Sequence, residues 1–169
     1  CYETNLWFAR NKVEMGQYDE AREILDKLIE DEEYCPEKIR NACYPIYADI
    51  CIQQKLYEEA IHYLNIACDN ARKKKIRIRY KYIIAQLYQE IGDNMNALKS
   101  FDEVISMNPK YDIAFNAKIN KATVFDGTSS SKEVLNSLNK LLKDEKNKEY
   151  QDQIYFALAN VYYTEGNEE

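Results

Sequence analysis

The chain has 169 residues, of which 46% are hydrophobic and 31% are charged, and its formal net charge is -6. With only 4 glycines and 3 prolines, this composition favours a folded helical chain over a turn-rich β protein or a disordered one. The acidic balance argues against general nucleic-acid binding. No stretch approaches the roughly 18 to 20 apolar residues that a membrane-spanning helix needs.

Apolar periodicity and turn signals divide the chain into helix pairs. We predict helices over 3–15 and 18–31, 37–54 and 57–72, 76–91 and 94–107, and 111–126 and 132–144, followed by a last helix over 148–165. Gly16 and Gly92 separate the helices of the first and third pairs, because glycine adopts the left-handed C-cap conformation at little cost. Lys55 stands at the corresponding position of the second pair. The turn of the fourth pair, over 126–131, is expanded and contains serines that can N-cap the next helix.

Small residues mark the centre of every helix pair. Four times, an alanine is followed twelve residues later by a second small residue that opens an i, i+4, i+7 apolar stripe: Ala9 and Ala21, Ala48 and Ala60, Ala85 and Ala97, and Ala122 and Val134. A fifth first alanine, Ala159, continues the series, and these alanines lie 37 or 39 residues apart. Self-similarity at this period predicts a single domain of stacked helix pairs, with repeats at about 2–36, 37–75, 76–110 and 111–147 and a half-repeat at 148–169. Such arrays are mostly binding surfaces and rarely active sites.

The last helix has no second helix to pair with. We expect its apolar face, formed by Ile154, Leu158 and Tyr162, to lack cover, so that this end of the chain dimerises or frays. Because the chain opens almost inside a helix and stops inside a repeat, we expect it to be a fragment of a longer protein.

The sequence contains no constellation that is typical of an enzyme, a cofactor site or a metal site. His62 is the only histidine and has no Cys or Asp at ligand spacing. The five cysteines form no CxxC motif, and Cys51 and Cys68 lie on apolar faces where Cys behaves as a small hydrophobe. The acidic cluster over 30–37 lacks the ligand spacing of a calcium loop and is expected to be a solvated link. We therefore predict no catalysis, no cofactor and no metal.

A basic run extends from Arg72 to Arg79. Its first part ends a helix, where cations interact favourably with the helix dipole, but Arg77 and Arg79 open the next helix, where they do not. The simplest interpretation is a solvated face. The alternatives are acidic groups of neighbouring helices, an acidic partner, or an anionic membrane or glycan, whereas nucleic acid is not expected for a single short patch on an acidic chain.

These features resemble the tetratricopeptide repeat, a 34-residue helix–turn–helix unit. The third pair carries the pattern best, with Ala85, Tyr88, Gly92, Ala97, Phe101 and Pro109. The sequence departs from the pattern at Lys12 and Cys51 in place of a helical Tyr, at Lys55 and Ser129 in place of the turn Gly, and at Val134 in place of Ala. The resemblance implies an all-α, right-handed superhelix (α-solenoid) of four helix-turn-helix repeats plus the first helix of a fifth. It also implies a non-catalytic scaffold that binds other proteins.

In this family the first helix of each repeat, helix A, lines a concave groove, and the second helix, helix B, lies behind it. By repeat register the predicted groove residues are Arg10, Asp49, Arg79, Tyr82, Gln86, Gln89, Asn116, Phe156, Asn160 and Tyr163, with Leu6, Val13, Pro45, Ile52, Ile119, Thr123 and Gln153 at the other register positions. Their amide, aromatic and charged groups suit an extended or helical peptide segment. Relatives that bind a C-terminal carboxylate use a Lys and Asn clamp, and we reject that mode because Asp49 would repel a carboxylate. For each groove residue, a solvated helix face is the alternative.

Three stretches also resemble the tetratricopeptide region of the PorW/SprE-type lipoproteins of Bacteroidetes, which belong to type IX secretion and gliding motility. These stretches lie within 9–18, 85–90 and 107–119, and the run 146–155 is also similar. The third stretch is the most specific, because generic repeats do not require Phe115-Asn116-Ala117 after the terminal proline.

This narrower resemblance implies a parent protein in the cell envelope, on the periplasmic side of the outer membrane. The membrane would be reached only indirectly, through a lipid anchor outside this fragment, and Cys1 is not expected to carry the lipid. A cytoplasmic location stays open. The alternative functions are a generic tetratricopeptide adaptor with an unrelated partner, or a regulatory helical domain of a larger enzyme or transcription regulator.

Overall fold

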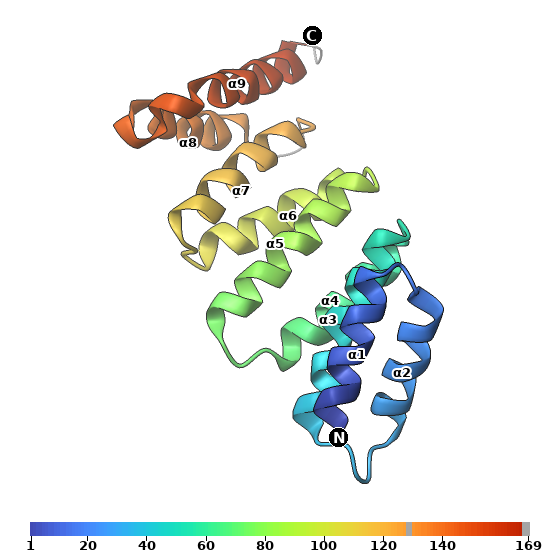
Figure 1. Ribbon diagram of the computed structural model, residues 1–169. Coiled ribbons are helices and arrows are strands. Elements are labelled where there is room, and N and C mark those ends of the chain that lie inside the picture. Colours follow the sequence, from blue (N-terminus) through green and yellow to red (C-terminus); the bar gives the residue numbers. More distant parts are fainter. Residues whose placement is uncertain (128–129, 167–169) are drawn as a thin grey trace. The chain divides into compact units, whose positions relative to one another are not determined.

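The computed structural model describes residues 1–127 and 130–166, and this part of the chain is built from helices without a strand (Figure 1). In chain order the helices are α1 (Tyr2–Glu14), α2 (Tyr18–Glu30), α3 (Glu37–Gln53), α4 (Tyr57–Asn70), α5 (Lys74–Glu90), α6 (Asn94–Ser106), α7 (Tyr111–Thr123), α8 (Ser131–Lys143), the 3-10 helix η1 (Glu145–Tyr150) and α9 (Gln151–Gly166). The predicted all-α helical-repeat fold is confirmed. The fourth-pair turn residue Ser129 lies outside the described residues.

The chain forms two compact units. The first unit, Cys1–Tyr80, contains α1 to α4 and the first part of α5, and the second unit begins at Lys81. In the first unit α1 packs against α2, α3 packs against α4, and α3 also contacts both α1 and α2. In the second unit α7 packs against α6, α8 and α9, and α8 also contacts α9. Each unit therefore stacks helix pairs on their neighbours, while a single domain stays a prediction.

The small residues that define the repeats lie in the helix-pair interfaces, as predicted. Their exposed fractions are 0% for Ala9, Ala21, Ala60, Ala85, Ala97 and Ala122, 1% for Ala48 and 3% for Val134. Small side chains let two helix axes approach to the roughly 8–10 Å that is usual for packed helices. The larger residues one turn later, such as Leu25 and Phe101, are then also fully buried, at 0% exposed.

Three of the turns inside the helix pairs have the same backbone hydrogen bonds. At the first turn the amide of Gln17 donates to the carbonyl of Lys12 at 2.8 Å, and the equivalent bonds at the second and third turns are 2.8 Å and 2.9 Å long. This bond is the signature of a Schellman C-cap, which needs one residue in the left-handed region. Gly16 and Gly92 take that conformation at φ 73° and 77°, and Lys55 takes it at φ 61°. Lys55 is therefore a true structural replacement for the turn glycine.

A buried tyrosine fastens α3 to the preceding helix pair in the first unit. Tyr47 is 4% exposed, and its hydroxyl donates to the carboxylate of Asp26 and, at 3.3 Å, to the carbonyl of Arg22. The Arg22 guanidinium lies 5.8 Å above the Tyr47 ring, whose other neighbour is the stacked ring of Tyr63 at 4.8 Å. Burial raises the pKa of Tyr47 first, and the hydrogen bond to Asp26 raises this pKa further. The hydroxyl therefore stays protonated and keeps its role as a donor.

The segment between α8 and α9 differs from the prediction. The helix predicted to begin at residue 148 begins instead at Gln151, after the 3-10 helix η1. The Asp144 carboxylate accepts from the amide of Lys146 at 3.1 Å, and Asn147 buries its side chain to 1% exposed. The Asn147 amide donates to the carbonyl of Leu141 at 2.8 Å and accepts from the Tyr111 hydroxyl at 2.7 Å. These tertiary bonds hold a 3-10 helix that includes residues 148–150, which sequence periodicity alone assigns to the last helix.

The predicted uncovered face of the last helix is wrong for two of its three residues. Ile154 and Leu158 are 0% and 8% exposed, because α9 packs against both α7 and α8. Tyr162 is exposed as predicted. The large exposed side chains of α9 are Tyr155 at 56%, Phe156 at 69%, Tyr162 at 57% and Tyr163 at 73%.

Candidate functional site

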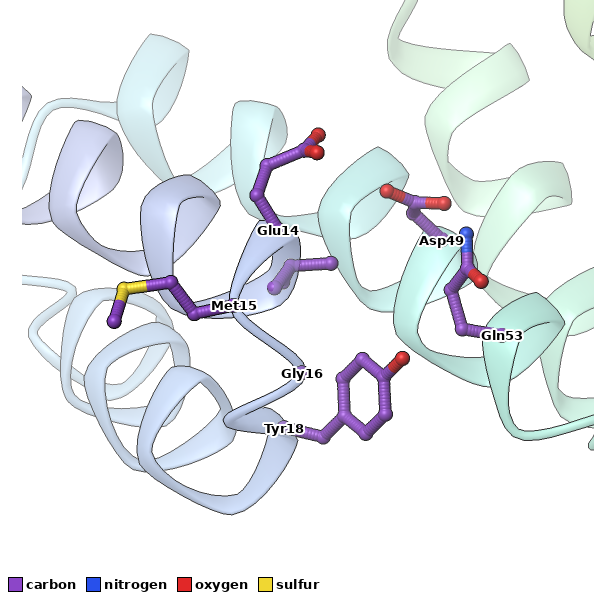
Figure 2. Close-up of a pocket in the computed structure, with 7 residues that line it drawn as sticks. Glu14, Met15, Gly16, Tyr18, Asp49 and Gln53 are labelled. Atoms are coloured by element: carbon purple, nitrogen blue, oxygen red, sulfur yellow. The ribbon is translucent and has the colours of Figure 1, made fainter.

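A pocket of about 380 Å³ opens in the first unit between the ends of two A helices. Its lining residues come from the end of α1, the following turn and the last two turns of α3: Val13, Glu14, Met15, Gly16, Tyr18, Asp49 and Gln53. Figure 2 shows the Tyr18 ring directed toward the end of α3 that carries Gln53, the carboxylates of Glu14 and Asp49 directed away from that ring, and Met15 pointing away from the other labelled side chains.

Local structure explains how these side chains meet. Asp49 and Gln53 are four residues apart on α3, so that they lie on the same face of the helix. Gly16 follows the end of α1 in the left-handed conformation and turns the chain, so that Tyr18 begins α2 beside the pocket. Val13 is 7% exposed and forms an apolar wall.

The two carboxylates of the pocket carry its charge. Among the described residues, no ion pair of 4.0 Å or less involves Glu14 or Asp49. The nearby Lys12 ammonium instead lies 2.8 Å from the Glu20 carboxylate and donates to Gln17 at 3.0 Å. Glu14 is the last residue of α1, where a negative charge is unfavourable to the helix dipole, so that helix stability does not explain it. The pocket is therefore suited to accept hydrogen bonds from a cation.

Comparison with known families identifies a repeat in two segments of the chain, one of which includes the α1 and α2 residues of this pocket. Residues 3–32 and 78–111 each match the tetratricopeptide repeat. These two segments are similar to the tetratricopeptide repeat. These repeats generally mediate protein–protein interaction and are typically non-catalytic. A comparison with curated proteins gives no significant match.

The pocket lies between the C-terminal ends of the first two A helices, α1 and α3. Asp49 is one of the predicted groove residues, and Val13 is one of the other positions that the repeat register places along the groove. Both residues line the pocket. Sequence reasoning missed Glu14 and Gln53, which lie four residues after Arg10 and Asp49. Extending the predicted groove stripe by one more turn of each A helix would have found them. Tyr18 was missed as well, because its position depends on the tertiary path after Gly16.

The other predicted groove residues of the first unit lie outside the pocket. Arg10 is exposed, and its guanidinium carbon lies 5.1 Å from the centre of the Trp7 ring, itself 63% exposed. Arg79 is exposed near the end of this unit, in the basic run on α5. Their role in binding stays a prediction.

Three predicted groove residues of the second unit contact neighbouring A helices. The Tyr82 hydroxyl accepts from the Asn120 amide at 3.2 Å, and the Gln89 amide donates to the Thr123 hydroxyl at 3.2 Å, so that both link α5 to α7. Asn160 links α9 to α7 by donating to the carbonyl of Ala122 at 2.9 Å. Long polar side chains can span the distance between adjacent A helices. The repeat register treats each helix by itself, so it does not predict these contacts between helices.

The remaining predicted residues of the second unit have more accessible surroundings. Asn116 lines a pocket of about 220 Å³ between α7, η1 and α9, together with Tyr111 and Tyr150. Phe156 lines a second pocket, of about 360 Å³, with Ile119. Gln86 is half-buried and Tyr163 is exposed.

The surroundings of His62 and Cys43 are those of structural residues. His62 is exposed beside the ring of Tyr63, with ring centres 5.4 Å apart. Burial raises the pKa of the Cys43 thiol to about 12, so that its reactive thiolate form is disfavoured at neutral pH. In residues 1–127 and 130–166 we find no group of three or more His, Cys, Asp or Glu side chains arranged to hold a metal. Nor does any helix of this part combine the length and apolar character needed to cross a membrane.

Proposed function

We propose that this chain is a non-catalytic scaffold whose first unit binds a protein segment through a Lys or Arg side chain. The observation that carries this proposal is the pair of carboxylates, Glu14 and Asp49, which line one pocket and have no ion-pair partner among the described residues. The segment lies along the A helices of the first two repeats, and its basic side chain enters the pocket.

The pocket can bind both parts of a basic side chain, its charged head and its aliphatic stem. A Lys ammonium has three donors and an Arg guanidinium has five, and hydrogen bonds from such groups to carboxylates are about twice as strong as neutral ones. The Gln53 amide oxygen and the Tyr18 hydroxyl supply further acceptors. The aliphatic stem of the basic residue would contact Val13 and the Tyr18 ring, as long cationic side chains commonly do on apolar surfaces.

A peptide-display selection tests this proposal and also reveals the peptide sequence that the pocket prefers. A random linear peptide library is selected on the purified chain and, in parallel, on the double variant Glu14→Gln, Asp49→Asn. The control variant, Glu23→Gln with Asp69→Asn, removes the same charge from exposed positions on α2 and α4.

We expect the native chain and the control to enrich peptides with Lys or Arg at one fixed position, and the pocket variant to lose that enrichment. Affinity of a selected peptide should fall at least roughly tenfold in the pocket variant, which corresponds to about 1.4 kcal/mol. Enrichment that is the same on all three proteins would refute the pocket as the binding site.

We further propose that the scaffold acts in the cell envelope, on the periplasmic side of the outer membrane, within a type IX secretion or gliding motility assembly. The support is the similarity of the stretches within 9–18, 85–90 and 107–119 to the PorW/SprE-type lipoproteins. In this proposal a lipid anchor elsewhere in the parent protein provides the contact with the membrane. Affinity capture from a Bacteroidetes envelope lysate should recover named secretion components with the native chain but not with the pocket variant. Recovery of cytoplasmic partners alone would favour a generic adaptor or a regulatory helical domain.

A further inference from the structure

The basic run over residues 72–79 belongs to the first unit and takes no part in the carboxylate pocket of that unit. It contains six of the chain's 23 Lys and Arg residues and none of its 29 Asp and Glu residues. The run therefore carries a formal charge of +6 in a chain of net charge -6, so that the remaining residues together carry -12. The run is a strongly basic patch on an otherwise acidic protein.

All of these cations are accessible, and the fold does not neutralise them. The exposed residues are Arg72, Lys73, Lys74, Lys75, Arg77 and Arg79. Within residues 1–127 and 130–166, the ion pairs of 4.0 Å or less use four other cations: Lys12, Arg40, Lys81 and Lys121. Acidic groups of neighbouring helices therefore do not account for the run.

Helix stability does not account for the run either. α5 begins at Lys74, and its first turn contains no acidic residue. The first turns of α1, α2, α3, α4, α7, α8 and α9 each contain one or two acidic residues, and α6 has the Asp93 carboxylate as its N-cap. Cations at a helix N-terminus oppose the helix dipole, so the start of α5 lacks a stabilisation that the other α-helices of the described residues have.

The start of α5 presents an exposed apolar residue between two rows of cations. The amides of Ile76 and Arg77 donate to the carbonyl of Lys73 at 2.9 Å and 3.2 Å, so that the helical path already includes Lys73. Lys73 and Arg77 are four residues apart and share one side of the helix. Lys75 and Arg79 share the other side in the same way. Ile76 lies between the two rows and is 38% exposed.

The opposite side of this helical segment is fixed to the body of the first unit. Ile78 is 6% exposed, and the Cys68 thiol of α4 donates to the carbonyl of Arg77 at 3.9 Å. Residues two apart on a helix point about 200° apart, so that Ile76 points away from the side that Ile78 buries. The two rows of cations and Ile76 therefore form one outward surface on a packed helix.

We propose that residues 72–79 are a docking surface for an anionic membrane. Cations on both sides of an exposed apolar residue fit a flat interface, where the apolar side chain enters the boundary with the acyl chains and the cations contact lipid phosphates. An extended acidic peptide would contact one row of cations and would leave Ile76 without a role. This contact is additional to a lipid anchor elsewhere, and it depends neither on the pocket nor on the envelope assignment.

Co-sedimentation of the full chain with lipid vesicles tests the proposal. The vesicles are made of phosphatidylcholine alone, or of phosphatidylcholine with about one third of the anionic lipid phosphatidylglycerol. The patch variant Lys75→Gln, Arg77→Gln removes one cation from each row. The matched control Lys27→Gln, Lys38→Gln removes the same charge from exposed positions on α2 and α3. A third variant, Ile76→Ser, removes the apolar centre.

We expect the native chain and the matched control to bind the anionic vesicles and not the neutral ones, with affinity that falls as salt is added. The patch variant should bind at least roughly tenfold more weakly. Ile76→Ser should weaken binding even at high salt, because an apolar contact is not screened. Urea unfolding of the patch variant should show a midpoint no lower than that of the native chain, since glutamine removes cations from a helix N-terminus.

Four results would overturn the proposal. The first is absence of native binding to the anionic vesicles, and the second is equal binding by the patch variant and its control. The third is competition by inorganic phosphate at the lipid phosphate concentration, which would indicate a site for a single anion. The fourth is a fluorescein-labelled polyglutamate peptide that binds the native chain when vesicles do not, which would make an acidic segment the occupant.

The pocket variant Glu14→Gln, Asp49→Asn separates this proposal from the proposed function. It removes two negative charges and leaves the basic run intact, so it should bind the anionic vesicles at least as well as the native chain. The patch variant should in turn enrich the same basic peptides as the native chain. Failure of one proposal therefore leaves the other testable.

Discussion

Replacing Gly92 by alanine is expected to destabilise the chain by about 1 kcal/mol, through backbone conformation alone. Gly92 has φ 77°, and a Cβ atom added there would have no other atom within 4 Å, so that no steric clash contributes. A residue with a Cβ atom in the left-handed region costs about 1–2 kcal/mol. Alanine also reduces the conformational entropy of the unfolded chain, which offsets about 0.4–1 kcal/mol of this cost.

The second repeat provides the reciprocal experiment. Lys55 already occupies the left-handed region at φ 61°, and its side chain is exposed. Lys55→Gly should therefore stabilise the chain by about 1 kcal/mol, since the same two contributions act with opposite sign. Gly166→Ala is the matched control, because Gly166 has no positive φ and an added Cβ atom would again have no other atom within 4 Å.

Urea unfolding followed by circular dichroism measures all three variants. With a urea m-value of about 1–3 kcal/mol/M, the midpoint should fall by about 0.3–1 M for Gly92→Ala and rise by a similar amount for Lys55→Gly. The m-value should not change, because the turns are exposed and the core is unaltered. The reasoning is refuted if Gly92→Ala behaves like Gly166→Ala, or if Lys55→Gly lowers the midpoint.

Two further predictions concern buried polar groups. Burial raises the pKa of Cys43 from 9.0 to about 12, so the unfolded chain releases this proton first and stability should fall as pH rises between about 9 and about 12. Urea titrations across that range should show a shallower fall for Cys43→Ala, and an identical fall would contradict the assignment. Asn147→Ala should destabilise by about 0.5–1.5 kcal/mol, because it removes the side-chain hydrogen bond to the carbonyl of Leu141, which keeps the amide of Asp144 as a donor at 3.2 Å. Tyr111→Phe removes only a partly exposed hydroxyl and should cost less in the same unfolding experiment; equal losses would show that Asn147 acts mainly through Tyr111.

The candidate pocket was only partly predictable from the sequence. Asp49 follows from repeat register, because register needs only the position of Ala48 within its helix. Tyr18 and the pairing of Glu14 with Asp49 required the structure, since they depend on where the turn after α1 lies against the end of α3. The same limitation explains Tyr82, Gln89 and Asn160, whose hydrogen-bond partners lie on other helices and whose groove role stays a prediction.

The sequence by itself determined the helix pairs, their order and the turns inside the first three pairs. Apolar stripes, small residues at fixed offsets and left-handed turn positions such as Gly16 are local features, so that they can be read without knowing which helices are neighbours. Only the tertiary structure decided which side of α9 is buried and that the chain around Asn147 forms a 3-10 helix. The physical reason is that α9 has apolar residues on more than one side, and packing against α7 and α8 buries Ile154 and Leu158 while leaving Ala159 exposed.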